Sequence, residues 1–143
     1  MNKKIKKMKT NEEILIEFGK LLVGKSFDWS LSDVENLRTF SKPLLIKDPP
    51  TQYLKSLSSE EYDKLLNFLP HILITQLIGV LHIFESDTPF RLIYKEDGND
   101  VDLASISEGL STEVATEYGW VSQFSKLLTD QQRLPPLLAL PQI

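Results

Sequence analysis

The feature that most constrains this chain is an apolar segment at residues 71–84, HILITQLIGVLHIF, which only Thr75, Gln76, Gly79 and His82 interrupt. A helix that is apolar on nearly all sides has to be covered on all sides by other elements. The segment is shorter than the stretch of about 20 apolar residues that a bilayer-spanning helix needs. We therefore predict a central buried helix at 71–84 and no membrane span. Periodicity leaves open whether Val80–Phe84 is a strand instead.

Three capping-box patterns mark helices that can supply this cover. They begin at Thr10, Ser32 and Ser58, each followed three residues later by a glutamate. The first pattern predicts an amphipathic helix of about 13 residues that Gly24 closes. The other two helices are expected to end where a proline intervenes, at Pro43 and Pro70, because proline lacks the backbone donor that a helix interior needs.

The rest of the chain predicts a short helix, a hairpin and a last helix. Asp48-Pro-Pro is expected to start a short helix near 53–57. Two short runs flank Asp97-Gly98, and both turn residues tolerate positive φ, which predicts a β-hairpin at about 90–104. After Gly109, apolar residues at helical spacing predict a last helix through Gly119; they are Val114, Tyr118, Val121, Phe124 and Leu128. The predicted fold class is mainly α (α+β), with five to seven helices packed around 71–84 and one small hairpin.

Length and composition favour one globular helical domain at residues 11–134. The chain has 143 residues and no cysteine, which excludes disulfide scaffolds and thiolate metal sites. Residues 1–10 hold five lysines and no acid, and we expect a disordered basic arm there, most of which is absent if Met8 is the true start. Residues 135–143, which begin with Pro135 and Pro136, are expected to run extended and to lay their leucines on the domain. Glutamates follow the basic arm where a signal peptide needs an apolar core, so we predict a cytoplasmic protein.

Concentrated negative charge is the strongest functional signal. The chain has 16 basic and 20 acidic residues, and five of the basic residues lie in 1–10; the other 133 residues thus hold 11 basic and 20 acidic residues, a net charge of −9. The window 85–117 holds nine acidic residues against only Arg91 and Lys95, a net charge of −7. Such a field repels nucleic acid and attracts a basic partner. We therefore predict that the partner is a basic protein, with a toxin as one candidate, and that the main body binds no nucleic acid.

Two spacings in this window point to a binding face. Asp100 and Asp102 point to one side of a predicted strand, where Lys95 faces Asp100 and leaves Asp102 free. Glu113 and Glu117 lie four residues apart on the predicted last helix, and such a like-charge pair costs a few tenths of a kcal/mol. Stability alone would not select that pair. The alternative interpretation is a solvated face with an ordinary excess of acid.

The candidate partner-binding set combines these carboxylates with one aromatic residue. It consists of Glu96, Asp97, Asp100, Asp102, Glu108, Glu113, Glu117 and Trp120. We expect Trp29 and Trp120 in the core or at its edge. Aromatic residues beside acidic rims are also where binding hot spots concentrate, and for this reason Trp120 is a candidate anchor.

No catalytic or metal-binding motif is complete. His82 and Glu85 stand one helical turn apart, which is half of a carboxylate–histidine metal site, and His71 lies too far along the helix to join His82. A calcium-loop pattern that starts at Asp97 fails at its fifth and sixth positions. Carboxylates at a hairpin tip are usually solvated, which disfavours a glycosidase pair. Phosphate-binding glycine loops and the nucleophile elbow are absent from the sequence, so we predict no cofactor and no metal.

These patterns favour a non-catalytic protein-binding module that uses an acidic face to bind and mask a basic protein. The most concrete form is a bacterial immunity or antitoxin-type neutraliser, an analogy of physical type that no residue motif carries. Two alternatives remain open. One is an enzyme of another type with a pocket near His82 and Glu85. The other is an adaptor that contacts nucleic acid or membrane through the N-terminal lysine arm.

Overall fold

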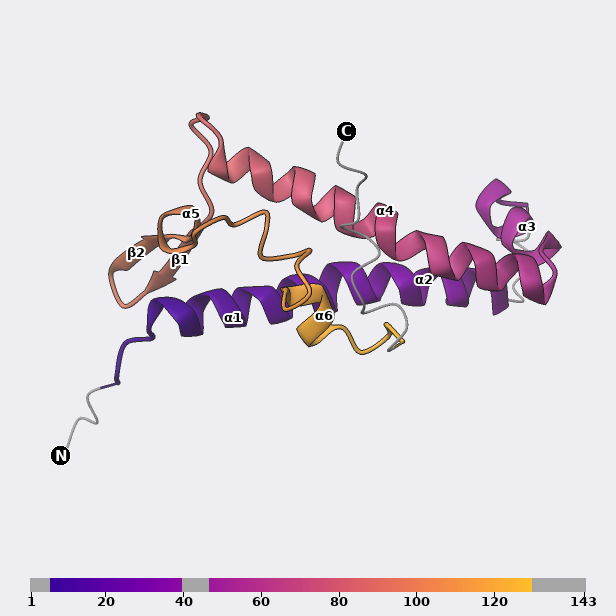
Figure 1. The fold of residues 1–143 in the computed structure, drawn as a ribbon, viewed down its shortest axis with the longest axis horizontal. Coiled ribbons are helices and arrows are strands. Elements are labelled where there is room, and N and C mark those ends of the chain that lie inside the picture. The colour runs from indigo at the N-terminus through magenta and orange to yellow at the C-terminus, as the bar shows by residue number, and fades with distance from the viewer. Residues whose placement is uncertain (1–5, 40–46, 130–143) are drawn as a thin grey trace.

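The computed structural model describes residues 6–39 and 47–129 and contains two long helical segments with a small hairpin at one end (Figure 1). The elements are α1 (Asn11–Leu22), the π-helical segment η1 (Val23–Asp28), α2 (Trp29–Thr39), α3 (Pro49–Ser56), α4 (Ser59–Glu85), β1 (Ile93–Glu96), β2 (Asn99–Asp102), α5 (Leu103–Ile106) and α6 (Trp120–Phe124). The predicted mainly helical fold with one two-stranded antiparallel sheet is confirmed.

Helices α1, η1 and α2 form one uninterrupted helical segment, which we call the long helix. It begins at the predicted capping box. The Thr10 hydroxyl accepts from Glu13 N at 3.1 Å, and the Glu13 carboxylate accepts from Thr10 N at 2.7 Å. The expected end at Pro43 lies outside the residues that the structure describes.

Gly24 does not close the first helix as predicted, because the long helix continues through it as η1. A glycine in a helix interior costs about 1 kcal/mol. Val23 and Phe27 on either side of Gly24 are fully buried, and each large apolar side chain contributes about 1.5–3 kcal/mol when it is buried. Packing thus outweighs the local penalty. Ser32, predicted as the cap of a second helix, lies inside α2.

Helix α4 passes through Pro70, and the predicted break there is wrong. Its start is confirmed, since Glu61 N donates to the Ser58 hydroxyl at 3.2 Å. A proline in a helix interior costs about 3 kcal/mol. Tyr62 and Ile74, on opposite sides of Pro70 along the helix, are both buried and hold the two halves against the rest of the molecule. Val80–Phe84 is helical.

The apolar segment 71–84 is not covered on all sides, so the predicted central buried helix is wrong. One face of α4 is buried through Ile74, Leu77 and Leu81, whereas Ile72 and Ile83 keep 47% and 46% of their surface exposed. A stripe at this spacing packs one face of a helix and leaves the other face in solvent. Among residues 6–39 and 47–129, α4 is the one helix that is long and apolar enough to cross a membrane by length and composition.

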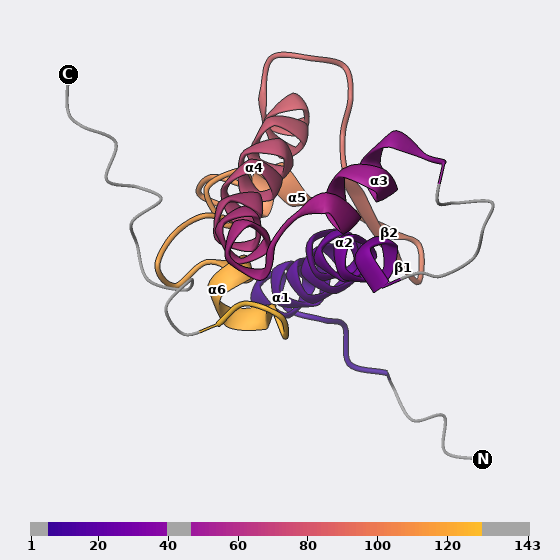
Figure 2. The same cartoon turned by 90° about the vertical axis from the view of Figure 1, so that its right-hand side faces the viewer.

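The core lies between the long helix, one face of α4 and the chain from 103 to 128. In the end-on view of Figure 2, α4 and α6 lie against different sides of the long helix. The large, fully buried apolar side chains are Val23, Phe27, Leu81, Leu110, Val114 and Val121. The long helix, rather than 71–84, is therefore the element around which the others pack.

The predicted hairpin forms with a two-residue turn. Asp97 and Gly98 have φ values of 46° and 85°, as their tolerance of the left-handed region led us to expect. Lys95 pairs with Asp100 in the register of β1 and β2, which confirms that predicted cross-strand pair.

The predicted last helix is wrong over most of its length, because residues 111–119 form turns and only Trp120–Phe124 is helical. Gly119 explains the difference. Trp120 N donates to Glu113 O at 2.7 Å, and a Cβ on Gly119 would lie 2.7 Å from the same oxygen. The chain therefore folds back on itself at a position where only glycine fits.

Parts of both predicted termini lie outside the described residues. Residues 6–10 of the expected disordered arm are described, and they contact the hairpin: Lys6 Nζ lies 3.7 Å from a Glu96 oxygen, and Lys9 N donates to Glu96 at 3.4 Å. The expected extended tail at 135–143 lies wholly outside the described residues.

Candidate functional site

Several of the seven predicted acidic contacts have partners within the protein. The Glu96 side chain is only 9% exposed and faces Lys6 and Lys9 of the N-terminal arm. Asp102, which was predicted to be free, lies 3.4 Å from Arg91 Nε and accepts from Ala104 N at 3.1 Å, where it caps α5. These two carboxylates are therefore occupied in holding the hairpin end of the molecule together.

Asp100 and Glu113 have weaker contacts within the protein than Glu96 and Asp102. The Asp100 carboxylate lies 3.9 Å from Lys95 Nζ, and because both side chains are well exposed, the pair contributes about 0–1 kcal/mol. Glu113 is half-buried and accepts from the Ser107 hydroxyl at 2.9 Å. Glu113 and Glu117 do not form the predicted like-charge pair on a helix, because residues 111–119 are not helical.

The three remaining acidic candidates lie on the surface. Asp97, Glu108 and Glu117 are exposed, and none of them forms an ion pair with any residue in 6–39 or 47–129. They come from the hairpin turn, the chain after α5 and the loop before α6. These carboxylates stay available to a partner.

A groove of about 430 Å³ between α1 and α6 brings two of the predicted residues together. We call it the acidic groove and define it by Glu12, Leu15, Ile16, Ile106, Glu113 and Trp120. Within residues 6–39 and 47–129, its lining contains two carboxylates and no lysine or arginine. Sequence reasoning missed Glu12, Leu15 and Ile16, because their pattern indicates only the first turns of an amphipathic helix. The fold places them in the same groove as Glu113.

Trp120 forms part of the wall of the acidic groove while belonging to the core. It is 4% exposed, and its ring meets Phe18 edge-to-face with 5.7 Å between the ring centroids. Gly19 lies directly against it, since a Cβ there would come within 2.6 Å of the indole. Trp120 therefore fixes α6 on the long helix and keeps the groove in shape.

Glu85, which with His82 forms the pair on which the enzyme alternative rests, contacts Ser111 of the loop that follows α5. Glu85 accepts from Ser111 N and from the Ser111 hydroxyl, both at 2.6 Å, and His82 Nδ1 lies 3.4 Å away. Burial acts to raise the pKa of Glu85, but the hydrogen bonds from Ser111 and His82 outweigh it and hold the pKa below its usual value. The Ser111 proton points to a carboxylate instead of an imidazole, which is not the arrangement that activates a nucleophile.

Across residues 6–39 and 47–129 there is no cluster of three or more histidine and acidic side chains that could hold a metal ion. Glu85 with His82 thus has no third ligand in that part of the chain.

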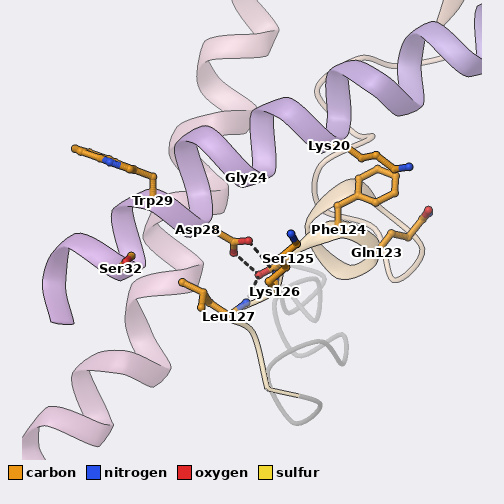
Figure 3. Close-up of a pocket in the computed structure, with 10 residues that line it drawn as sticks. All are labelled: Lys20, Gly24, Asp28, Trp29, Ser32, Gln123, Phe124, Ser125, Lys126 and Leu127. Carbon is orange, nitrogen blue, oxygen red and sulfur yellow. Dashed lines mark hydrogen bonds between the residues drawn. The ribbon is translucent and has the colours of Figure 1, made fainter. Parts of the chain in front are cut away.

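A second and larger groove, of about 850 Å³, lies on the other side of α6 (Figure 3). We call it the lysine groove and define it by Lys20, Asp28, Trp29, Phe124, Lys126 and Leu127. At its floor the buried Asp28 carboxylate accepts from the Ser125 hydroxyl at 2.6 Å and from Lys126 N at 2.9 Å. Trp29, expected in the core or at its edge, is 64% exposed at the rim.

The two grooves share α6 as their dividing wall. Gln123 and Phe124 line both of them, and the Lys20 ammonium lies 5.7 Å from the centroid of the Phe124 ring. Comparison of the chain with known protein families, with curated proteins and with solved structures gives no match. The functional argument therefore depends on the chemistry of these surfaces.

Proposed function

We propose that this chain is a non-catalytic protein-binding module that binds and masks a basic protein in the cytoplasm, in the manner of a bacterial immunity or antitoxin-type neutraliser. The observation that carries the proposal is the acidic groove, where Glu12 and Glu113 stand beside the apolar side chains of Leu15 and Ile16 and no basic residue of the described chain joins the lining. A lysine or arginine of a partner supplies the missing charge and lays its aliphatic stem on the apolar wall.

The mechanism has two stages that use different residues. The exposed carboxylates of Asp97, Glu108 and Glu117 raise the rate at which a basic protein meets this surface. Contact at the acidic groove then removes Glu12 and Glu113 from water beside apolar side chains, where an ion pair is stronger than on an open surface. Trp120 takes part as the rigid wall of the groove and contributes shape rather than exposed contact area.

The contacts of the other candidate residues support a binding role over the two alternatives. Glu85 is held ionised by Ser111 and His82, so it is a weaker base than an unperturbed glutamate. In the N-terminal arm, the side chain of Lys9 pairs with Glu17 and that of Lys6 faces Glu96. These lysines are therefore less available to nucleic acid or an anionic membrane.

The proposal is tested by capture from the native host with the full chain immobilised at low and at high salt, followed by mass spectrometry. A basic protein should be retained at low salt and released at high salt. The variant Glu12→Lys/Glu113→Lys should lose at least about tenfold in affinity for it. The variant Glu12→Gln/Glu113→Gln removes both charges but keeps acceptors for the Ser107 hydroxyl, and it should lose affinity in the same direction.

The matched control is Glu60→Lys/Asp63→Lys, which changes the net charge equally at the first turns of α4. Glu60, like Glu12, lies in the first turn of a helix, so its reversal carries a similar helix-dipole cost of about 0.3–1 kcal/mol. This control should keep its affinity within about twofold. Equal binding by the groove variants and the control, or retention of no basic protein, contradicts the proposal.

A further inference from the structure

We propose that the lysine groove is a second binding site, which takes an acidic protein segment carrying an apolar or aromatic side chain. The proposal does not depend on the function assigned to the acidic groove, because the two sites require partners of opposite charge. Its basis is the juxtaposition, around one groove of about 850 Å³, of an exposed tryptophan, an exposed leucine and two lysines that form no ion pair within residues 6–39 and 47–129.

The charge of the groove differs from that of the rest of the protein. Lys20 and Lys126 are exposed, and neither side chain forms an ion pair with a residue that the structure describes. The one carboxylate that the described residues bring to the lining, Asp28, is buried, and its two oxygens accept from the Ser125 hydroxyl and from Lys126 N. In a chain with a net charge of −4, this groove therefore presents two exposed ammonium groups, one of them over the Phe124 ring, that lack an ion-pair partner among the described residues.

Two apolar side chains of the groove, Trp29 and Leu127, are more exposed than is usual for tryptophan and leucine. Trp29 is 64% exposed and Leu127 is 48% exposed. Tryptophan is highly buried on average in folded proteins and is enriched among the residues that dominate binding energy. Figure 3 shows Lys20 with Phe124 at one end of the groove and Asp28 and Lys126 near its middle. Trp29 lies at the other end, on the rim, with its indole pointing away from Asp28. A segment in which two acidic residues follow an apolar side chain matches this order.

The backbone at the groove is also irregular. Residues 23–28 are π-helical within an otherwise α-helical segment, and such π-bulges are frequent at functional sites because they cost stability. Gly24 of this segment lines the groove, and no atom of the described residues lies within 4 Å of the position that a Cβ would take there. The helix surface is therefore open to a ligand along this turn.

The chemistry favours a carboxylate-bearing protein segment over a phosphate-bearing ligand. Among the described residues no arginine lines the groove, and the bidentate guanidinium is the side chain best suited to phosphate. The Lys126 N–H is already donated to Asp28, which takes away a backbone donor. The Asp28 charge in the floor also opposes a dianionic group more strongly than a single carboxylate.

The test uses the immobilised full chain and a phage-displayed library of short random peptides. The enriched peptides should combine aspartate or glutamate with tryptophan, phenylalanine or leucine. Lys20→Glu/Lys126→Glu should bind them at least about tenfold more weakly. Lys7→Glu/Lys47→Glu makes the same charge change at exposed lysines outside the groove and should bind within about twofold of the wild type. Trp29→Ala should also weaken binding.

Nuclear magnetic resonance then locates the site with one synthetic peptide from the enriched set. The peptide should shift the Trp29 indole N–H and the Lys126 amide, and leave the resonances of Glu12 and Ile16 in place. Enrichment of neutral or basic peptides, or undiminished binding by Lys20→Glu/Lys126→Glu, overturns the proposal. If a second copy or the chain's own residues 130–143 fill the groove, the selection will enrich no peptide. That result also overturns the proposal.

Loss of this site and loss of the acidic-groove function are distinguishable. Reversal of Lys20 and Lys126 adds negative charge, so it should preserve or strengthen the binding of a basic protein. Reversal of Glu12 and Glu113 should leave binding of the acidic peptide intact. Either site can therefore fail its test while the other passes.

Discussion

The contact between Gly19 and Trp120 gives a prediction in which two local effects oppose each other. Gly19 lies in the middle of α1, where alanine has the higher helix propensity by about 1 kcal/mol. A Cβ at this position would lie 2.6–2.7 Å from three atoms of the Trp120 ring. The ring cannot yield easily, because Trp120 is buried and packed against Phe18. The sign of the effect is therefore decided by packing.

The expected magnitude follows from these two terms. Extra atoms in a well-packed core cost about 1–3 kcal/mol, and distances this short place Gly19→Ala at the upper end of that range. After subtraction of the propensity gain, we expect the free energy of unfolding to fall by about 1–2 kcal/mol. The corresponding fall in melting temperature is about 3–6 °C for a domain of this size.

The assay is urea unfolding followed by circular dichroism, with Gly79→Ala as the matched control. Gly79 lies in α4 with nothing within 4 Å of its Cβ position, so alanine should stabilise the protein there by about 0.5–1 kcal/mol. The two glycine-to-alanine changes should therefore have opposite signs. A Gly19→Ala protein as stable as the wild type, or more stable, would refute the packing of α6 on the long helix.

Three further predictions concern single side chains. Asp28→Ala leaves the Ser125 hydroxyl and Lys126 N–H without their acceptor and should cost about 2–4 kcal/mol in urea unfolding; an unchanged midpoint contradicts the contact. The pKa of Glu85 lies below its ordinary value of 4.5 in the folded protein, so ionised Glu85 stabilises the fold above pH 4.5 and this contribution is lost as the pH falls through the lowered pKa. Glu85→Gln should therefore flatten the acidic part of a plot of unfolding free energy against pH. A plot identical to that of the wild type contradicts the Ser111 contact. Trp29→Ala should change the free energy of unfolding by less than about 0.5 kcal/mol, since the side chain is mostly exposed; a larger loss would place Trp29 in the core.

The elements that sequence predicted correctly are those fixed by neighbouring residues. The capping boxes at Thr10 and Ser58 form with both of their hydrogen bonds, and Asp48 caps α3 where proline occupies the first turn. Asp97-Gly98 forms the turn of the hairpin. In each case the donor, the acceptor and the backbone preference lie within four residues of one another, so no distant contact is needed to decide the outcome.

The errors occur where packing between distant segments outweighs a local penalty. Gly24 and Pro70 were expected to end helices, and both lie inside helices whose buried faces offset the cost. The opposite error concerns residues 113–128, where helical spacing was present but Gly119 passes so close to Glu113 O that the chain turns instead. In that segment the apolar spacing identified buried residues such as Val114, Val121 and Leu128, but it did not predict the backbone conformation that buries them.

The acidic window shows why charge counted along a sequence is an incomplete guide to a surface. The Glu96 carboxylate pairs with the Lys6 ammonium and accepts from Lys9 N, and both residues lie about ninety positions earlier in the chain. Glu12, outside the window, meets Glu113 in the acidic groove. Neither relation has a local signal, so the total negative charge was predictable but its arrangement in space was not.

The central claim, that paired carboxylates beside α6 bind a basic protein, is tested most directly by stopped-flow association kinetics with the captured partner. The association rate constant of the wild type should fall as salt is raised. Glu12→Lys/Glu113→Lys should lower the low-salt rate constant by about tenfold or more. A rate constant that changes neither with salt nor with this reversal would contradict the account.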